Sequence, residues 1–165
     1  MPSFTTKLAS AADIPIIIDI HKNTWEPTYR EILSQEQISF MSDKFYSPEA
    51  LESSMSENGH QFHILLADDM ACGFASVSKE SNNHYKLQKI YVLPSCQGTG
   101  AGKYLIMHVE TFVREKGAQT ISLNVNRYNK ARSFYEKMAY QVIREEDIPV
   151  GPYWMNDYVL EKKLI

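Results

Sequence analysis

The stretch PSCQGTGAGKYL, from Pro94 to Leu105, decides how the rest of the sequence is interpreted. Gly98, Gly100 and Gly102 lie between an apolar run and an amphipathic run. Glycines at such a junction let backbone N–H groups come close to a ligand, and a helix that begins behind them adds the positive end of its dipole. The stretch therefore predicts a phosphate-binding loop, and its spacing has to show which kind.

Two widespread phosphate-binding loops do not fit this spacing. A P-loop needs G-x-x-x-x-G-K-[ST], but Gln97 stands where its first glycine belongs and Tyr104 stands where the metal-binding hydroxyl belongs. The dinucleotide fingerprint needs G-x-G-x-x-G, and here Lys103 stands at the place of the third glycine. A nucleotide-binding module thus stays only as an alternative, which titration with ATP and Mg²⁺ would test.

Length and composition restrict the class of protein. The chain has 165 residues, of which 44% are hydrophobic, so we expect one core and a single domain over residues 1–165. The net charge of −3 argues against a nucleic-acid partner. Cys72 and Cys96 suit a reducing compartment, and no secretion signal or membrane-length apolar run is visible, so we expect a cytoplasmic protein. The histidines and cysteines show no metal-ligand spacing, so no metal is expected.

The hydrophobic pattern predicts helices first, then strands, then strands that alternate with helices. We expect one helix from Asp13 to Thr24, interrupted by Trp25-Glu26-Pro27, and two more that begin at Ser34 and at Ser47. The other expected elements are strands over 3–8, 61–67, 71–79, 84–93, 120–125, 140–144 and 153–161, and helices from the glycine loop to Gly117 and over 129–138. This order indicates an α/β (α+β) domain built on a mixed sheet.

A second motif lies downstream of the glycine loop, in LNVNRYNKARSFYEKMAY from Leu123 to Tyr140. It resembles the second cofactor segment of the GNAT-superfamily N-acetyltransferases, in which an Asn and an Ala precede a sequence of the type FYEK-x-GF. Gln97-x-x-Gly100-x-Gly102, which follows the strand Lys89–Val92 and a proline, resembles the pyrophosphate loop of the same family. On these two linked motifs the chain is identified as a member of that family.

The resemblance implies the GNAT fold: a mixed central sheet of about six to seven strands and about four flanking helices. In that fold an antiparallel meander is followed by two parallel strands that splay apart, which would be Tyr85–Leu93 and Thr120–Val125. Helices over about 11–58 would lie on the acceptor side. Residues of about 61–145 would form the acetyl-CoA-binding core, and a closing strand would cover about 153–162.

The resemblance also assigns roles to individual residues. Acetyl-CoA would be the co-substrate, held without a metal. The strand before the loop would pair its backbone with the pantetheine arm and polarise the thioester carbonyl with one N–H. Tyr135 would be the general acid that protonates the departing thiolate. The residues expected to bind the cofactor are Ile90, Tyr91, Val92, Gln97, Gly98, Thr99, Gly100, Ala101, Gly102, Lys103, Asn129 and Tyr135.

The sequence departs from the family pattern at three places. Lys86–Val92 holds no carboxylate, so the base that deprotonates the amine is unassigned; Glu26 is the candidate, and an exposed loop carboxylate is its alternative interpretation. Ala139 replaces the glycine that usually follows the second helix, so this helix is expected to end differently. Asn129 lies six residues before Tyr135 instead of seven, so its side chain is expected to reach a different atom of the cofactor arm, to cap the helix, or to do both.

We therefore expect an acetyl-CoA-dependent N-acetyltransferase that transfers an acetyl group to a primary amine by direct attack in a ternary complex. Thr24-Trp25-x-x-Thr28-Tyr29 and Asn156-Asp157-Tyr158 resemble the branch that includes bacterial polyamine acetyltransferases, so the expected acceptor is a small amine. A protein N-terminal or lysine acetyltransferase and a non-catalytic acyl-CoA-binding domain stay open as alternatives. A homodimer is also open, because the final strand could pair between subunits.

Overall fold

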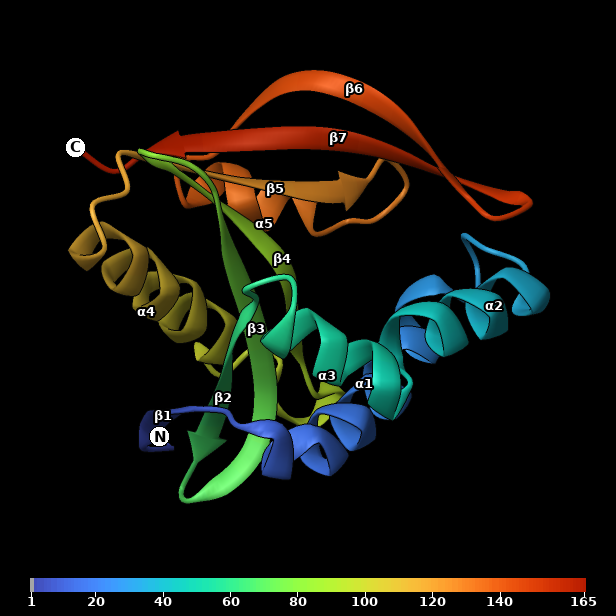
Figure 1. Cartoon of the computed structure of the whole chain (residues 1–165), viewed down its shortest axis with the longest axis horizontal. Helices are drawn as coiled ribbons and strands as arrows, with labels where there is room; N and C mark the ends of the chain where they lie inside the picture. The colour runs from blue at the N-terminus through green and yellow to red at the C-terminus, as the bar shows by residue number, and fades with distance from the viewer. Residues whose placement is uncertain (1) are drawn as a thin grey trace.

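The computed structural model describes residues 2–165, and Figure 1 shows how the elements are arranged. The chain begins with a strand, continues through three helices and three strands, and then adds two helices and three further strands. The elements are β1 (Phe4–Leu8), η1 (Ala11–Asp13), α1 (Ile14–Tyr29), α2 (Gln35–Tyr46), α3 (Pro48–Ser56), β2 (Gln61–Ala67), β3 (Met70–Ser81), β4 (His84–Val92), η2 (Pro94–Cys96), α4 (Ala101–Glu115), β5 (Thr120–Asn126), α5 (Arg132–Lys137), β6 (Gln141–Val150) and β7 (Tyr153–Lys163).

Within residues 2–165 the seven strands form one sheet in the order β1-β2-β3-β4-β5-β7-β6. β4 and β5 pair in parallel, and every other neighbouring pair is antiparallel. The expected mixed sheet is therefore confirmed, with five α-helices instead of about four in the described part of the chain. Over Asp157–Glu161, β7 pairs with β5 on one side and β6 on the other. This stretch has no free edge, so the predicted pairing of the final strand between subunits is not available there.

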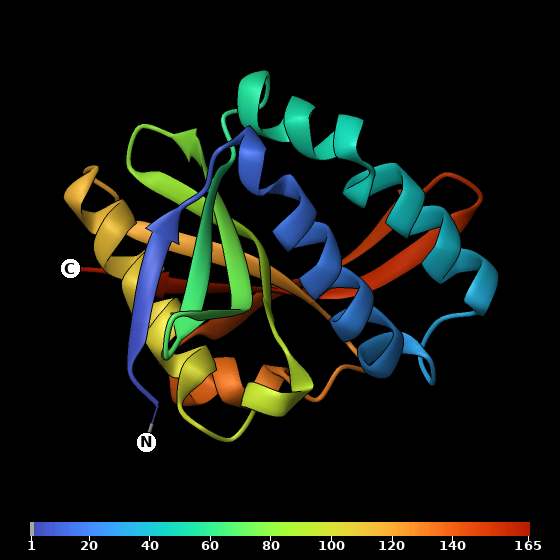
Figure 2. The same ribbon diagram turned by 90° about the horizontal axis from the view of Figure 1, so that it is seen from below.

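The helices cover both faces of the sheet. Figures 1 and 2 show α1, α2 and α3 together on one face, which we call the α1 face, and α4 and α5 on the other, which we call the α4 face. Each face buries its own hydrophobic cluster. No helix among the described residues combines the length and the apolar character that crossing a bilayer requires.

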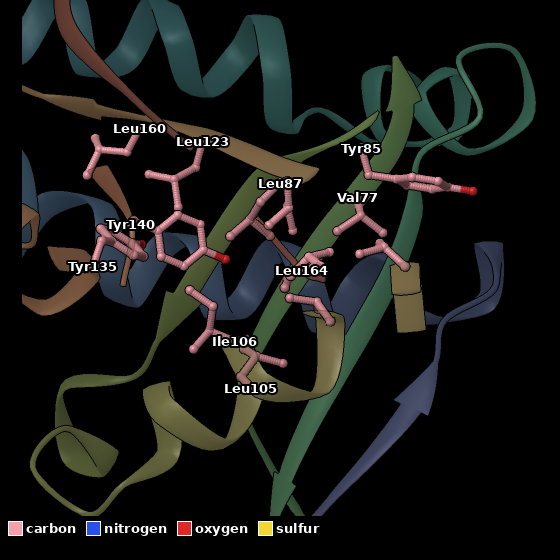
Figure 3. Packing of buried hydrophobic residues seen from close by; sticks show 14 of the residues in the cluster. Val77, Tyr85, Leu87, Leu105, Ile106, Leu123, Tyr135, Tyr140, Leu160 and Leu164 are labelled. Atoms are coloured by element: carbon pink, nitrogen blue, oxygen red, sulfur yellow. The ribbon is translucent and has the colours of Figure 1, made fainter. Parts of the chain in front are cut away.

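The pattern of α4 explains how it lies on the sheet. Leu105, Ile106, Val109 and Val113 recur at helical spacing and are all fully buried. Figure 3 shows Leu105 and Ile106 beside residues of the strands, and Tyr135 from α5 in the same cluster. Each fully buried aliphatic side chain contributes about 1.5–3 kcal/mol. The N-terminus of α4 is therefore held firmly at the end of β4.

Helix α1 is longer than the sequence pattern indicated. It runs without a break from Ile14 to Tyr29, so the expected interruption at Trp25-Glu26-Pro27 is wrong. A proline inside a helix costs about 3 kcal/mol. Trp25 and Tyr29 lie four residues apart on the buried side of the helix and are only 5% and 6% exposed. Burial of these two aromatic side chains outweighs the cost of Pro27, since each contributes about 1.5–3 kcal/mol or more.

The helix caps follow the sequence prediction. Ser34 Oγ accepts a hydrogen bond from the Gln37 backbone N at 3.1 Å, and Ser47 Oγ accepts one from Ala50 N at 3.2 Å. The Gln37 side chain does not bond back to the backbone N–H of Ser34, as it would in a capping box. It instead donates from Nε2 to the Trp154 carbonyl oxygen at 2.9 Å, which ties α2 to β7. The early helices are thereby fixed to the C-terminal hairpin.

The second predicted helix of the C-terminal half is shorter than expected. α5 begins at Arg132, because Asn129 forms a local turn in which its Oδ1 accepts from Ala131 N at 2.9 Å. Ala139 follows this helix with a φ of 74°, in the left-handed region. Tyr140 N bonds to Tyr135 O and Ala139 N bonds to Glu136 O, which is the Schellman pattern. The helix thus ends as it would with glycine, and the expectation of a different ending is wrong.

Candidate active site

The parallel strands β4 and β5 separate halfway along their length. They pair only from His84 opposite Thr120 to Leu87 opposite Leu123. At this point the register between β3 and β4 shifts and leaves Gln88 without a partner residue, which is a β-bulge. The edge of β4 that faces β5 is therefore unpaired from Gln88 onward. The expected splay between these strands is confirmed.

A cavity of about 900 Å³ lies at this opening. Ile90, Val92 and Leu123, which pack with the α4-face cluster, line it together with Tyr29 and Tyr91, which belong to the α1-face cluster. The cavity therefore passes between the strands from one face of the sheet to the other. It has one end at the glycine loop and α5, and another end at the C-terminal turn of α1.

The glycine loop leaves backbone donors free at the first of these ends. The first hydrogen bond inside α4 runs from Tyr104 N to Gly100 O at 3.0 Å, so the N–H groups of Ala101, Gly102 and Lys103 have no partner within the helix. Gly98 and Gly100 have φ values of 79° and 89°. A Cβ added at either glycine would meet no atom within 4 Å. This open, electropositive helix end suits an anionic group.

The structure brings together most of the residues predicted from the sequence. Those that line the cavity are Ile90, Tyr91, Val92, Gln97, Gly98, Gly100, Gly102, Lys103, Asn129 and Tyr135. Ala101 is buried beneath the loop, and the Thr99 hydroxyl donates to the Cys96 carbonyl oxygen, so these two shape the loop without lining the cavity. Gln97 Nε2 donates to Val92 O at 3.2 Å and holds the loop against the end of β4.

Tyr135 lies in the wall between the cavity and the α4-face cluster. Its side chain is 8% exposed, and its ring makes edge contacts with Phe134 and Tyr140 at centroid distances of 5.2 and 6.0 Å. Burial raises the pKa of Tyr135 above its usual value, and the nearby Tyr29 adds to this. The phenol is therefore protonated at neutral pH and can donate a proton or a hydrogen bond.

Two residues named from the sequence, Tyr29 of the Thr24–Tyr29 stretch and Tyr91, line the α1 end of the cavity together with Lys89, for which the sequence predicted no role. Tyr29 and Tyr91 place their hydroxyl oxygens 3.4 Å apart, and burial raises the pKa of both phenols. Burial lowers the pKa of Lys89 to about 8, and its Nζ lies 5.4 Å from the ring centre of Tyr46. Asn124 lies within the segment Leu123–Tyr140 that carries the second motif, but no role was predicted for it, because its place at the opening depends on how β4 pairs with β5.

Glu26, the candidate base, is not brought to the cavity. The residue is exposed on α1 and does not line the cavity wall. Because α1 continues past Pro27, Glu26 stays on the outer side of the helix while Trp25 and Tyr29 face inward.

Within the described residues, no group of three or more His, Cys, Asp or Glu side chains is arranged to hold a metal ion.

Comparison with known proteins gives a consistent picture. The family model described as "Acetyltransferase (GNAT) domain" matches residues 29–154. A spermidine N(1)-acetyltransferase from Thermoplasma acidophilum is 28% identical over 166 residues, which cover 98% of each chain. A [ribosomal protein bS18]-alanine N-acetyltransferase from Haemophilus influenzae is 34% identical over 79 residues, 48% of this chain and 53% of that protein.

Solved structures extend the likeness to the fold. The crystal structure of the PaiA N-acetyltransferase from Thermoplasma acidophilum in complex with coenzyme A superimposes with a TM-score of 0.82 at 29% identity, and covers 98% of this chain and 99% of that one. A GCN5-related N-acetyltransferase from Rhodopseudomonas palustris gives a TM-score of 0.83 at 18% identity, with 99% and 98% coverage. The second likeness concerns the fold alone.

Proposed function

The chain belongs to the GNAT acetyltransferase family, and from this premise we propose that it transfers the acetyl group of acetyl-CoA to a primary amine of a small, polyamine-like molecule. The observation that carries the proposal is the cavity between β4 and β5. It has an electropositive backbone cradle at one end and is bordered by the C-terminal turn of α1 at the other. Two substrates can therefore meet inside the sheet from opposite faces, as direct transfer requires.

The glycine loop fits the diphosphate of acetyl-CoA. The unpaired N–H groups of Ala101, Gly102 and Lys103 point out of the first turn of α4, and the Lys103 ammonium lies in the same wall. The open space at Gly98 and Gly100 allows the close approach of a phosphate. The unpaired edge of β4 from Gln88 to Val92 then offers backbone groups to the pantetheine arm. Asn129, whose Oδ1 is held by Ala131 N, has its Nδ2 left to donate to the same arm.

The transfer step follows from these positions. The amine nitrogen attacks the thioester carbonyl carbon, a C–N bond forms, and the C–S bond breaks. Of the two protons that the ammonium nitrogen loses overall, one ends on the sulfur of coenzyme A and the other passes to solvent. We assign the protonation of the thiolate to Tyr135, because its phenol is protonated and lines the cavity beside Asn129. A backbone N–H of Ile90–Val92 would stabilise the negative charge on the carbonyl oxygen.

The preference for a small amine rests on the relatives and on the shape of the site. The near-full-length relative from Thermoplasma acidophilum is named a spermidine N(1)-acetyltransferase. Around the α1 end, the β6–β7 hairpin reaches toward α2 in both views (Figures 1 and 2), and Gly151 at its tip contacts the Phe40 ring. This contact and the Gln37–Trp154 hydrogen bond hold the hairpin on α2, and a hairpin held there would restrict the approach of a bulky protein acceptor.

An acceptor screen tests the proposal. Purified protein is mixed with acetyl-CoA and, in separate reactions, with spermidine, n-butylamine, a peptide with a free N-terminal alanine, and an N-terminally blocked peptide that contains lysine. Release of free coenzyme A thiol is the readout. We expect release with spermidine above the level of either peptide. Faster release with a peptide would support the protein-acetyltransferase alternative. Binding of coenzyme A without release by any amine would support a non-catalytic domain.

A further inference from the structure

Under the proposed function, on which this inference rests, the α1 end of the cavity receives an amine that carries a positive charge. In the described part of the chain, the cavity wall carries four cationic side chains and one carboxylate, which is the exposed Glu31. The cations are Arg30, Lys89, Lys103 and Lys130. Such a wall suits phosphates, but an acceptor that arrives as an ammonium ion needs a negative group near its path.

Asn124 on β5 and Gln88 on β4 are the polar wall residues next to the point where the strands separate, and the Gln88 amide is already bonded to Ser78 and Glu80. Asn124 follows Leu123, the last residue of the parallel pairing. Leu123 and Val125 pack in the α4-face cluster, so the side chain between them lies on the α1 face, the side from which the amine would enter. Asn124 Nδ2 donates a hydrogen bond to Asp157 Oδ2 at 3.2 Å. An ionised carboxylate can only accept, so this bond turns the amide oxygen of Asn124 away from Asp157.

Asp157 is an unusual group to find behind this wall. Asp157 is 6% exposed, and its Oδ1 has no hydrogen-bond partner in residues 2–165. Its cross-strand partner on β6 is Glu146, so two carboxylates project from the same face. Burial raises the pKa of Asp157 and Glu146 adds to the rise, while the Asn124 hydrogen bond, Lys86 and Arg127 oppose it. Tyr29, on α1, is the other titratable group that faces it.

A buried carboxylate with an empty acceptor position is costly for the fold. Its charge also acts strongly, because the surroundings screen it less than water would. Arg127, the nearby arginine, is already paired with Glu145 and Asp147. Lys86, the other nearby cation, forms no ion pair with Asp157 within residues 2–165, so the negative charge of Asp157 is available to a cation at the α1 end of the cavity.

We propose that Asn124 and Asp157 form the subsite that holds the amino group of the acceptor. Asn124 Oδ1 accepts a hydrogen bond from that group. Asp157 is a positioning residue behind Asn124, which holds the amide in this orientation and supplies the negative charge. The subsite selects a cationic amine over a neutral molecule of the same size, and it places the nitrogen beside the opening where the thioester would lie.

The test is calorimetric titration of spermidine into protein saturated with coenzyme A. Asp157→Asn keeps the size of the side chain and removes the charge, so we expect the dissociation constant for spermidine to rise at least tenfold while that for coenzyme A stays within twofold. In turnover assays the KM for spermidine should rise, with a smaller change in kcat. Glu161→Gln is the matched control, because Glu161 lies on the same face of β7, four residues away. It should leave both constants unchanged.

A second variant keeps the test decisive if Asp157→Asn does not fold. Asn124→Leu keeps the branched shape of the side chain and lacks the amide oxygen, so it should weaken spermidine binding by a similar factor. Unchanged spermidine binding in either folded variant would overturn the subsite, and so would an equal weakening by Glu161→Gln. If the wild-type protein binds spermidine through Asp157 but releases no thiol with any amine, the proposed function fails while the subsite stands. If thiol is released and Asp157→Asn has an unchanged KM, the subsite fails alone.

Discussion

Substitution of Gly100 should have two effects that can be measured separately. Backbone strain should lower the free energy of unfolding, and the new side chain should block the approach of coenzyme A. Gly100 precedes the first residue of α4 with a φ of 89°, a conformation that costs an L-residue about 1–2 kcal/mol. Gly100→Ala and Gly100→Val should each lower the free energy of unfolding by about that amount. For a chain of 165 residues, 1 kcal/mol corresponds to a decrease in Tm of roughly 2–4 °C.

The effect on coenzyme A should be larger than the effect on stability. The new Cβ would project into space where no protein atom lies within 4 Å, which is where we place the diphosphate. A charge-assisted hydrogen bond to a phosphate oxygen is worth about 1.5–3 kcal/mol. Loss of one such bond by Gly100→Ala should raise the dissociation constant about tenfold, and loss of two by Gly100→Val should raise it about a hundredfold or more.

Gly59→Ala provides the matched control. Gly59 ends the turn after α3 with a φ of 68°, and a Cβ added there also meets nothing within 4 Å, but it does not line the cavity. Thermal unfolding followed by circular dichroism should show a similar loss of Tm for both alanine variants. Calorimetric titration with coenzyme A should show weaker binding only for the Gly100 variants. Wild-type affinity in Gly100→Val would refute the assignment of the loop, whatever its Tm.

Three further predictions use other parts of the molecule. Tyr135→Phe should lower kcat by about 10²-fold in the thiol-release assay with little change in coenzyme A affinity, since only the donor hydroxyl is lost; an unchanged kcat would remove Tyr135 from the mechanism. Ala139→Gly should raise the free energy of unfolding by about 0.5–1 kcal/mol in a urea titration, because glycine adopts the observed φ of 74° without strain, and a loss of stability would contradict the helix ending. Burial lowers the pKa of His21 and His63 to about 4. Below pH 6.5 the unfolded chain therefore binds more protons than the folded protein. The Tm should fall as the pH is lowered from 6.5 toward 4. His63→Phe should reduce this fall, and a Tm that is constant over that range would contradict the neutral, buried state of the two rings.

Several features were predictable from the sequence because they depend on nearby residues. The glycine loop and the Ser34 and Ser47 caps are all set by the conformational needs of a few consecutive residues. The two cofactor motifs identified the family for the same reason, since each is a continuous segment. The predicted order of helices and strands, which followed from local hydrophobic periodicity, is also close to the observed one.

Other features were decided only by contacts between distant segments. Pro27 was read as a break in α1, but burial of Trp25 and Tyr29 keeps the helix intact. Ala139 adopts the left-handed conformation because the Schellman hydrogen bonds and the burial of Tyr140 outweigh its local preference. Local preferences are worth about 1 kcal/mol or less per residue, apart from proline, and packing of one large side chain exceeds that.

The sequence by itself determined the glycine loop at the start of α4, where we place the diphosphate, because a run of glycines at a helix start fixes the directions of consecutive N–H groups. It did not determine where an amine would bind. The wall at that end comes from α1, β4 and β5, and a hydrogen bond joins Asn124 in this wall to Asp157 on β7 behind it, 33 residues away. The charge of a carboxylate matters there only because the sheet buries it, and burial is a property of the assembled fold.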